Sequence, residues 1–507
     1  MLNHTILIRC DLFPGSGAGH LKRCSVLANA LKKLGFSAIF VIDEVSGPLP
    51  LSLDFPIHRI SGTFDNFVDA KAMVTLAKWI GTKIILGDSY RISQAWVALL
   101  RSAGLVVILI DELGIGSEAC LRIDYSPVPK QLKGPALSLL GPRYFITDSL
   151  LLNSRSSSPK RMIAHAGGTG NFFVASEVYA AALHASEAAG LDIAWLCPTD
   201  ATYSCLKEAG LFRDGHEIVY WKKGKNNIWS EFDIVVGPAS TSLFEAILQG
   251  ALPVSFPTSN TQASERDSWL KIGHALHLTR EEISSRECAE HIINLSIDYF
   301  VRLRSELDFF AKQIDGKGAE RCAATIADML LGKSIKSYEE PMEVSSIRKC
   351  DLRDANSFLD ARNAPLARAV STDTDHIIKW HEHLRWWLNE TIERFVVVGI
   401  DETEAFFWHR PIKVWGRDYL IGGWFPAGKS PSLDVAVKLL DWQLGYCAKK
   451  YPEHIWLATI KKENRAVILL NRYYQFISGD PESHKAVQEL FPGTNDDFVV
   501  LQRKARI

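Results

Sequence analysis

A histidine near the start of the chain has the surroundings expected of a general base. His20 follows a loop that contains Gly17 and Gly19, between a strand-like segment that reaches Asp11 and a helix-like segment. Glycines at a strand-to-helix turn let backbone N–H groups approach a polar or anionic ligand. A neutral imidazole there could take a proton from water. The glycine pair lacks the third glycine of a dinucleotide fingerprint. A loop glycine pair with a helix-capping histidine remains the alternative interpretation.

The elements that must hold this histidine alternate between apolar strands and helices. Nearly continuous β-branched runs separated by helices are typical of a parallel sheet that is covered on both faces. We expect His20 in the cleft at the carboxyl end of that sheet. The predicted strands are Thr5–Arg9, Ala38–Ile42, Lys83–Leu86 and Val106–Ile110, and the first helix is Leu21–Leu34.

A second α/β series begins after a Ser-rich linker, Asn153–Lys160. Its predicted strands are Met162–His165, Ile193–Cys197 and Asp233–Val236, and its helices include Val174–Ala189, Ser242–Leu248 and Ala311–Leu331. After Gly332–Pro341 the order of elements becomes that of an α+β domain. The predicted fold class is therefore α/β, with two Rossmann-like lobes at 1–152 and 160–335 and a C-terminal α+β domain at 342–507.

Composition bounds the function classes. The chain has 507 residues, of which 47% are hydrophobic and 23% charged, as in a globular protein of roughly three domains. The net charge of −1 argues against nucleic-acid or membrane-surface binding. No apolar run approaches the roughly 20 residues of a membrane span, and Met1–Cys10 lacks a signal-peptide pattern. Nine scattered cysteines without a CxxC pair favour a cytoplasmic protein with no metal site.

An ordered set of motifs over residues 5–280 resembles the UDP-2,4-diacetamido-2,4,6-trideoxy-β-L-altropyranose hydrolases of pseudaminic acid biosynthesis. That family is similar to the two-lobed, GT-B-type UDP-sugar glycosyltransferases. Two positions differ from its pattern: Phe244 stands where asparagine is usual, and Gly170 where aspartate is usual. The motifs are Arg9-x-Asp11, Gly17-x-Gly19-His20-x-x-Arg23-Cys24, Asp88-Ser89-Tyr90, Ile110-Asp111-Glu112, Gly141-Pro142-x-Tyr144, Gly167-Gly168-Thr169, Ala239-Ser240-Thr241-Ser242 with Glu245, and Asn260 with Gln262.

This resemblance implies a role for each matching residue. His20 would activate water, with Asp11 and Tyr90 beside it on the sugar. The substrate would also meet Gly17, Gly19 and Arg23 in the first lobe. In the second lobe, Gly167, Gly168 and Thr169 would form a backbone nest for phosphate. Ser240, Thr241 and Ser242 would bind the diphosphate and Glu245 the ribose, and Gln262 would also bind the substrate. Each also has a plain structural interpretation, as a rim tyrosine for Tyr90 or as helix caps for the serines and threonine.

Residues 342–507 resemble GNAT-type N-acetyltransferases, in particular those that acetylate amino sugars on nucleotide carriers. The resemblance rests on Arg362-Asn363-x-Pro365, His383-x-x-Trp386-Trp387, and Asn464-Arg465-Ala466 with Tyr473. It implies that acyl-CoA is bound by Gly428, Lys429 and Ser430, in the loop between the fourth strand and the long helix. Asn464 and Tyr473 would also bind it. Two prolines in that loop remove N–H donors, so a loop that has lost tight acyl-CoA binding is the alternative.

Three functions are compatible with these patterns. The first is hydrolysis of a UDP-linked amino sugar, which needs no cofactor, fused to an acetyltransferase domain with acetyl-CoA as co-substrate. The second is a GT-B glycosyltransferase, because the architecture fits both reactions equally. The third is a hydrolase whose C-terminal domain only binds. The expected partner is a UDP-linked amino sugar in each case.

Overall fold

The chain divides into two compact units, Met1–Tyr338 and Glu339–Ile507. The computed structural model describes residues 5–12, 19–44, 53–60, 64–134, 137–149, 157–167, 171–220, 227–258, 265–333, 346–371, 374–399, 403–428, 433–494 and 496–506. In these residues no helix is both long and apolar enough to cross a membrane.

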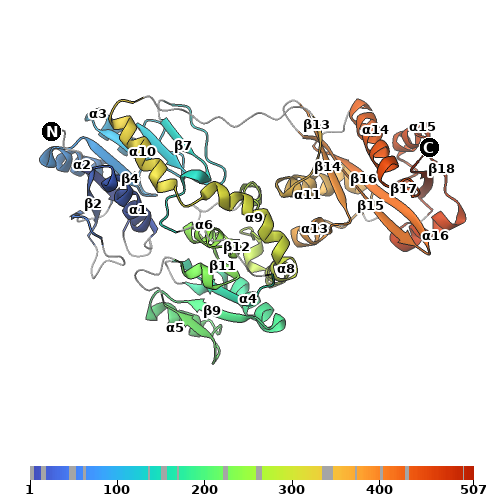
Figure 1. The fold of residues 1–507 in the computed structure, drawn as a ribbon, viewed down its shortest axis with the longest axis horizontal. Coiled ribbons are helices and arrows are strands. Elements are labelled where there is room, and N and C mark those ends of the chain that lie inside the picture. The colour runs from blue at the N-terminus through green and yellow to red at the C-terminus, as the bar shows by residue number, and fades with distance from the viewer. Residues whose placement is uncertain are drawn as a thin grey trace. The chain divides into compact units, whose positions relative to one another are not determined.

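The first lobe of unit 1 is a seven-stranded parallel sheet in the order β3-β2-β1-β4-β5-β6-β7 (Figure 1). All six residues of β1 are buried, as expected for a central parallel strand. The strands are β1 (Thr5–Cys10), β2 (Ser37–Asp43), β3 (Ile57–Ile60), β4 (Ile84–Asp88), β5 (Val106–Ile110), β6 (Leu121–Asp124) and β7 (Leu137–Leu140), and the helices are α1 (Gly19–Lys33), α2 (Asn66–Ile80) and α3 (Gln94–Ser102).

The second lobe of unit 1 is a five-stranded parallel sheet in the order β10-β9-β8-β11-β12. Two parallel sheets of this kind in one unit confirm the predicted pair of Rossmann-like lobes. The elements are β8 (Arg161–His165), α4 (Ser176–Ala189), β9 (Asp192–Leu196), α5 (Asp200–Glu208), β10 (Glu217–Val219), β11 (Ile234–Pro238), α6 (Thr241–Leu248), β12 (Leu252–Phe256), α7 (Arg266–Leu270), α8 (Arg286–Asp298), α9 (Phe300–Ile314) and α10 (Gly318–Leu330).

The predicted single helix over Ala311–Leu331 is wrong. The chain turns between α9 and α10, at Asp315 with φ of 25° and Gly316 with φ of 74°. Both values lie in the left-handed region, which favours glycine. The Asp315 carboxylate stabilises the turn by accepting hydrogen bonds from the Lys317 N–H and from Arg321. The turn lets α10 return to the first lobe, where it contacts α1.

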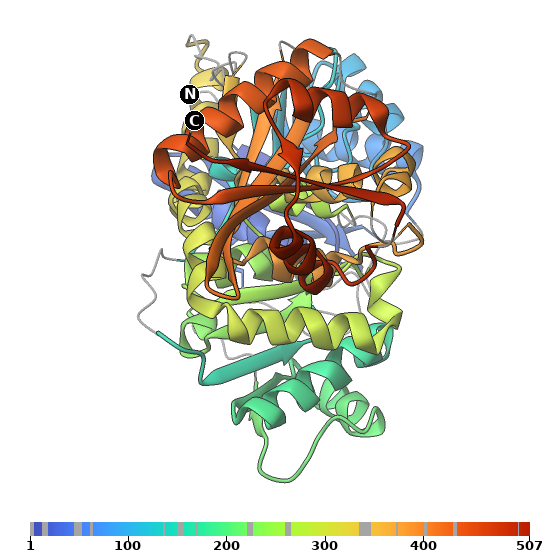
Figure 2. The same ribbon diagram turned by 90° about the vertical axis from the view of Figure 1, so that its right-hand side faces the viewer.

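The C-terminal unit is an α+β domain around one mixed sheet in the order β13-β14-β15-β16-β17-β19-β18 (Figure 2). Its single parallel contact joins β16 and β17 over three residue pairs only, Tyr419–Ile421 with Ile455–Leu457. Among the described residues, no pairing joins the two strands beyond these pairs. The elements are β13 (Ser346–Lys349), α11 (Ala355–Asn363), α12 (Pro365–Ala369), α13 (Trp380–Trp387), β14 (Glu393–Val398), β15 (Thr403–Val414), β16 (Arg417–Pro426), α14 (Leu433–Lys450), β17 (Ile455–Lys461), α15 (Arg465–Tyr473), β18 (Ile477–Ser478), α16 (Pro481–Leu490) and β19 (Phe498–Lys504).

Candidate functional site

The strand order of the first lobe marks the position of a ligand crevice. The chain runs outward from β1 through β2 to β3, and then returns to β4 on the other side of β1. Ligands of open α/β sheets bind outside the carboxyl ends of the strands at such a reversal. Here β1 leads into α1, which carries His20, and β4 ends at Asp88. The topology therefore brings these two side chains together, although 68 residues separate them.

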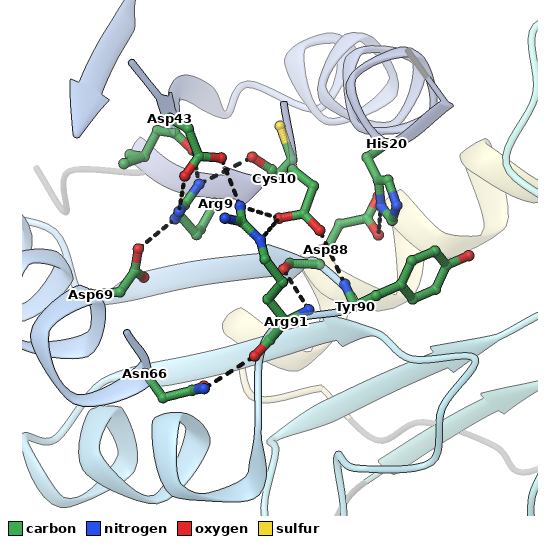
Figure 3. Close-up of polar contacts among 12 residues, drawn as sticks. Arg9, Cys10, His20, Asp43, Asn66, Asp69, Asp88, Tyr90 and Arg91 are labelled. Carbon is green, nitrogen blue, oxygen red and sulfur yellow. Dashed lines mark hydrogen bonds and ion pairs between the residues drawn. The ribbon is translucent and has the colours of Figure 1, made fainter. Parts of the chain in front are cut away.

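His20 and Asp88 form a hydrogen-bonded pair. The Nδ1 atom of His20 lies 2.8 Å from Oδ1 of Asp88, as Figure 3 shows. Nη2 of Arg23 lies 3.2 Å from the same Nδ1. A carboxylate only accepts and a guanidinium only donates, so the shorter contact assigns the proton to Nδ1. That tautomer leaves the Nε2 lone pair as the basic site, and among the described residues Nε2 has no hydrogen-bond partner.

Asp88 is held as a carboxylate. Its side chain is fully buried and accepts from Arg23 Nε at 2.7 Å, from Arg23 Nη2 at 2.5 Å and from the Cys24 thiol at 3.3 Å. Burial alone would raise the pKa of this carboxyl, but the Arg23 charge and the hydrogen bonds from Arg23 and His20 outweigh burial and keep the pKa well below its ordinary value. Asp88 can therefore orient His20 and stabilise its protonated form.

Tyr90 and Glu112 complete the rim of this site. The Tyr90 hydroxyl donates to Oε2 of Glu112 at 2.6 Å, and Oε1 of Glu112 accepts from Arg23 at 3.2 Å. The Tyr90 ring stands edge-on to the His20 ring, with centroids 4.7 Å apart. Burial and the Glu112 charge raise the pKa of Tyr90, so its hydroxyl keeps its proton. Asp88, Tyr90 and Glu112 line a small recess at the ends of β4 and β5.

Asp11 lies at the same end of the sheet but has other partners. Its Oδ1 accepts from Arg91 at 3.0 and 2.6 Å, and its Oδ2 accepts from the Tyr90 N–H at 3.2 Å. The network continues from Arg91 to Asp43, from Asp43 to Arg9, and from Arg9 to Asp69 (Figure 3). Asp11 thus fixes the backbone of Tyr90, and among the described residues it forms no hydrogen bond with His20.

The second lobe has an equivalent reversal of strand order between β8 and β11. His165 ends β8, and its Nδ1 accepts from the Gly167 N–H at 3.2 Å. The other ring nitrogen therefore carries the proton, and it lies 3.4 Å from the Ser242 hydroxyl. Ser242 and Ser240 share a hydrogen bond of 2.8 Å. Burial lowers the pKa of His165 to about 4, so a neutral imidazole joins the glycine loop to the first turn of α6.

Of the remaining predicted residues of unit 1 apart from Glu245, three lie in the described part of the chain and the others lie outside it. Gly19 begins α1, and Thr241 begins α6. The buried Arg23 side chain donates hydrogen bonds to Asp88, to Glu112 and to the Tyr125 hydroxyl. Gly17, Gly168, Thr169 and Gln262 lie outside the described residues, as does Gly170.

Glu245 and Phe244 contact the first lobe. The Glu245 carboxylate lies 2.7 Å from Lys22 Nζ on α1, where the resemblance places it on a ribose. Phe244 packs on Phe145, with ring centroids 4.8 Å apart, and on Tyr125. The residue that replaces the family's asparagine is therefore part of an aromatic cluster between the lobes.

In the C-terminal unit, β16 is the fourth strand and α14 is the long helix that follows it. Gly428 lies after β16 with φ of 91°, and Lys429 and Ser430 lie outside the described residues. The Asn464 side chain accepts from the Val467 N–H and caps α15. Tyr473 is 78% exposed at the end of that helix.

The structure adds Asp88 and Glu112 to the site. Both stand in motifs noted in the sequence, where neither was given a role. Each is at or just beyond the end of a buried strand, and the strands β4 and β5 are neighbours. That position at the carboxyl edge of the sheet was the available signal.

No family model and no curated protein matches the chain. Solved structures with a similar fold include the spinosyn rhamnosyltransferase SpnG, at 14% identity and a TM-score of 0.49, which covers 64% of this chain and 100% of its own. MurG of Acinetobacter baumannii is 13% identical with a TM-score of 0.43, over 64% of this chain and 99% of its own. An N-acetyltransferase from Staphylococcus aureus Mu50 is 14% identical with a TM-score of 0.27, over 32% of this chain and all of its own. At such identities the likeness concerns the fold alone, and the chemistry rests on this chain's own residues.

Proposed function

We propose that unit 1 hydrolyses a UDP-linked amino sugar, UDP-2,4-diacetamido-2,4,6-trideoxy-β-L-altropyranose, and releases UDP. The observation that carries this proposal is the His20–Asp88 pair at the strand reversal of the first lobe. The choice of this substrate rests on the motifs that resemble the pseudaminic acid hydrolases. They include the serines at the start of α6.

In the proposed reaction, Nε2 of His20 takes a proton from a water molecule. The water oxygen forms a bond to the anomeric carbon while the bond from that carbon to the diphosphate oxygen breaks. The departing UDP takes up the electron pair and is stabilised at the second lobe by the first turn of α6. Asp88 holds the imidazole in the required tautomer and offsets the charge that it gains.

We further propose that the C-terminal unit transfers an acetyl group from acetyl-CoA to the amino group of the same kind of sugar. This proposal is supported by the end of the pairing between β16 and β17 at Leu457, among the described residues. Backbone groups on facing, unpaired strand edges can hydrogen-bond an extended ligand. Acetyl-CoA would lie between these strands, with the Gly428 loop at its pyrophosphate.

The test is UDP release by the wild-type protein and by His20→Ala on this UDP-sugar. A suitable control is His184→Ala, because His184 lies on α4 with a side chain that is 61% exposed. We expect His20→Ala to remain folded and to lose turnover, and His184→Ala to keep it. Turnover that appears only when a sugar acceptor is added would instead identify a glycosyltransferase. Unchanged turnover in His20→Ala would exclude His20 as the base.

A further inference from the structure

One ion pair joins the helix of the proposed base to the helix of the proposed phosphate site. Lys22 lies on α1, two residues after His20, and Glu245 lies on α6, three residues after Ser242. The Lys22 Nζ is 2.7 Å from Oε1 of Glu245. The exposed fractions of the two side chains are 24% and 7%. At this burial, solvent screens the pair much less than it screens a surface pair.

The Glu245 carboxylate collects donors from three parts of unit 1. Besides Lys22 of the first lobe, Thr147 in the segment between the lobes donates to Oε1 at 3.4 Å. The Trp229 indole N–H of the second lobe donates to Oε2 at 3.5 Å. The Trp229 ring in turn contacts the ring of His165, with centroids 5.1 Å apart. The Glu245 carboxylate thus connects Lys22 of α1 with Trp229 and, through the ring contact of Trp229, with His165.

Phe244 makes a second contact at the preceding position of α6. Its ring lies against Phe145 between the lobes, and 6.4 Å from the ring of Tyr125 in the first lobe. The Tyr125 hydroxyl is hydrogen-bonded to Arg23, the residue that holds Asp88. Two consecutive residues of α6 therefore contact the first lobe, Glu245 through its ion pair with Lys22 of α1 and Phe244 through aromatic packing near Tyr125.

We propose that Lys22 and Glu245 are positioning residues, whose ion pair sets the placement of His20 relative to a diphosphate held at the start of α6. The proposal rests on the proposed function, because it assigns the two helices to the two ends of one substrate. Neither side chain touches the reacting atoms in this scheme. Loss of Lys22 leaves the buried Glu245 carboxylate without its cationic partner. This costs free energy and weakens the contact between the lobes.

The variants are Lys22→Met, Glu245→Gln and the double variant, with Lys33→Met as the matched control. Lys33 lies on the same helix, and its side chain is 73% exposed at 4.0 Å from Glu320. We expect Lys22→Met to lower kcat about tenfold to a hundredfold, because misplacement by about 1 Å can cost about a hundredfold in rate. For Lys22→Met, the Kd for UDP should change less than about threefold. The double variant should lie within about twofold of the single variants, because the two residues act through one contact.

Hydrogen exchange of the full chain gives a readout that does not depend on turnover. In Lys22→Met and in Glu245→Gln, the amides of α6 and of residues 141–147 should exchange faster than in the wild type, and in Lys33→Met they should not. Additive losses of kcat, or exchange in α6 equal to that of the control, would overturn the proposal. If the wild-type protein turns over no UDP-sugar, the proposed function fails, and the exchange experiment still decides whether the pair holds the lobes together.

Discussion

Replacement of Asp88 by asparagine separates the electrostatic role of this residue from its shape. Asparagine has nearly the same volume but no charge and only one oxygen. The buried Arg23 would keep Glu112 as its only carboxylate partner, since Asp88 now supplies two of its hydrogen bonds. Breaking a buried ion pair by removing one partner costs about 3–5 kcal/mol. The substitution should therefore lower the free energy of unfolding by that order.

The same substitution should lower turnover more than the loss of stability explains. The asparagine amide can accept from Nδ1 of His20 or donate to it, so it no longer fixes the proton on Nδ1. General-base catalysis contributes roughly 10²–10⁴-fold in rate. The assay is UDP release at a temperature where circular dichroism shows the variant to be folded, together with urea unfolding. Asp124→Asn is the control, because Asp124 pairs with Arg122 at 2.5 Å and both side chains are fully buried in the same lobe. Equal turnover in the two variants would refute the role of Asp88.

Three further predictions concern the second lobe and the C-terminal unit. The free energy of unfolding should fall as the pH drops from 6.5 to about 4, because unfolded His165 takes a proton that the buried ring resists. The loss is about 3 kcal/mol, and His165→Gln should flatten this slope in urea unfolding at several pH values. Gly237→Ala should lower the thermal midpoint, because a Cβ there would lie 2.1 Å from Nε2 of His165; an unchanged midpoint would contradict the packing described. Acetyl-CoA at about 100 times its Kd should stabilise the C-terminal unit by about 2.7 kcal/mol in calorimetry, and no shift would contradict the proposed acetyl transfer.

The lobes could be predicted from the sequence because central parallel strands are mostly apolar. β1 is buried at every residue, and its apolar run Ile6–Ile8 stands out although Thr5 and Arg9 of the same strand are polar. The turn at Asp315 and Gly316 was missed, because the apolar period continues on both sides of it. The Asp-Gly pair at this point was the local signal for a break.

The candidate site was predictable only in part, because its decisive contacts are long-range. His20 stands out through its glycine loop and Asp88 stands in a motif of its own, but their pairing follows only when β1 and β4 are known to be neighbours. The partners of Glu245 come from α1 and from the segment between the lobes, and no spacing in the sequence indicates them. A motif can thus mark a residue as functional while leaving its partner unknown.

The charged network behind Asp11 limits how this lobe can change in evolution. Asp69, Arg9, Asp43, Arg91 and Asp11 alternate in sign, and each arginine bridges two carboxylates. Loss of Arg9 removes the ion pair of Asp69, and loss of Arg91 removes that of Asp11, while Asp43 keeps the other arginine in each case. Loss of Asp43 removes one of the two carboxylate partners of each arginine. Each single substitution therefore leaves at least one remaining group with one ion-pair partner fewer. Related chains should therefore keep these five positions as a block or exchange them together.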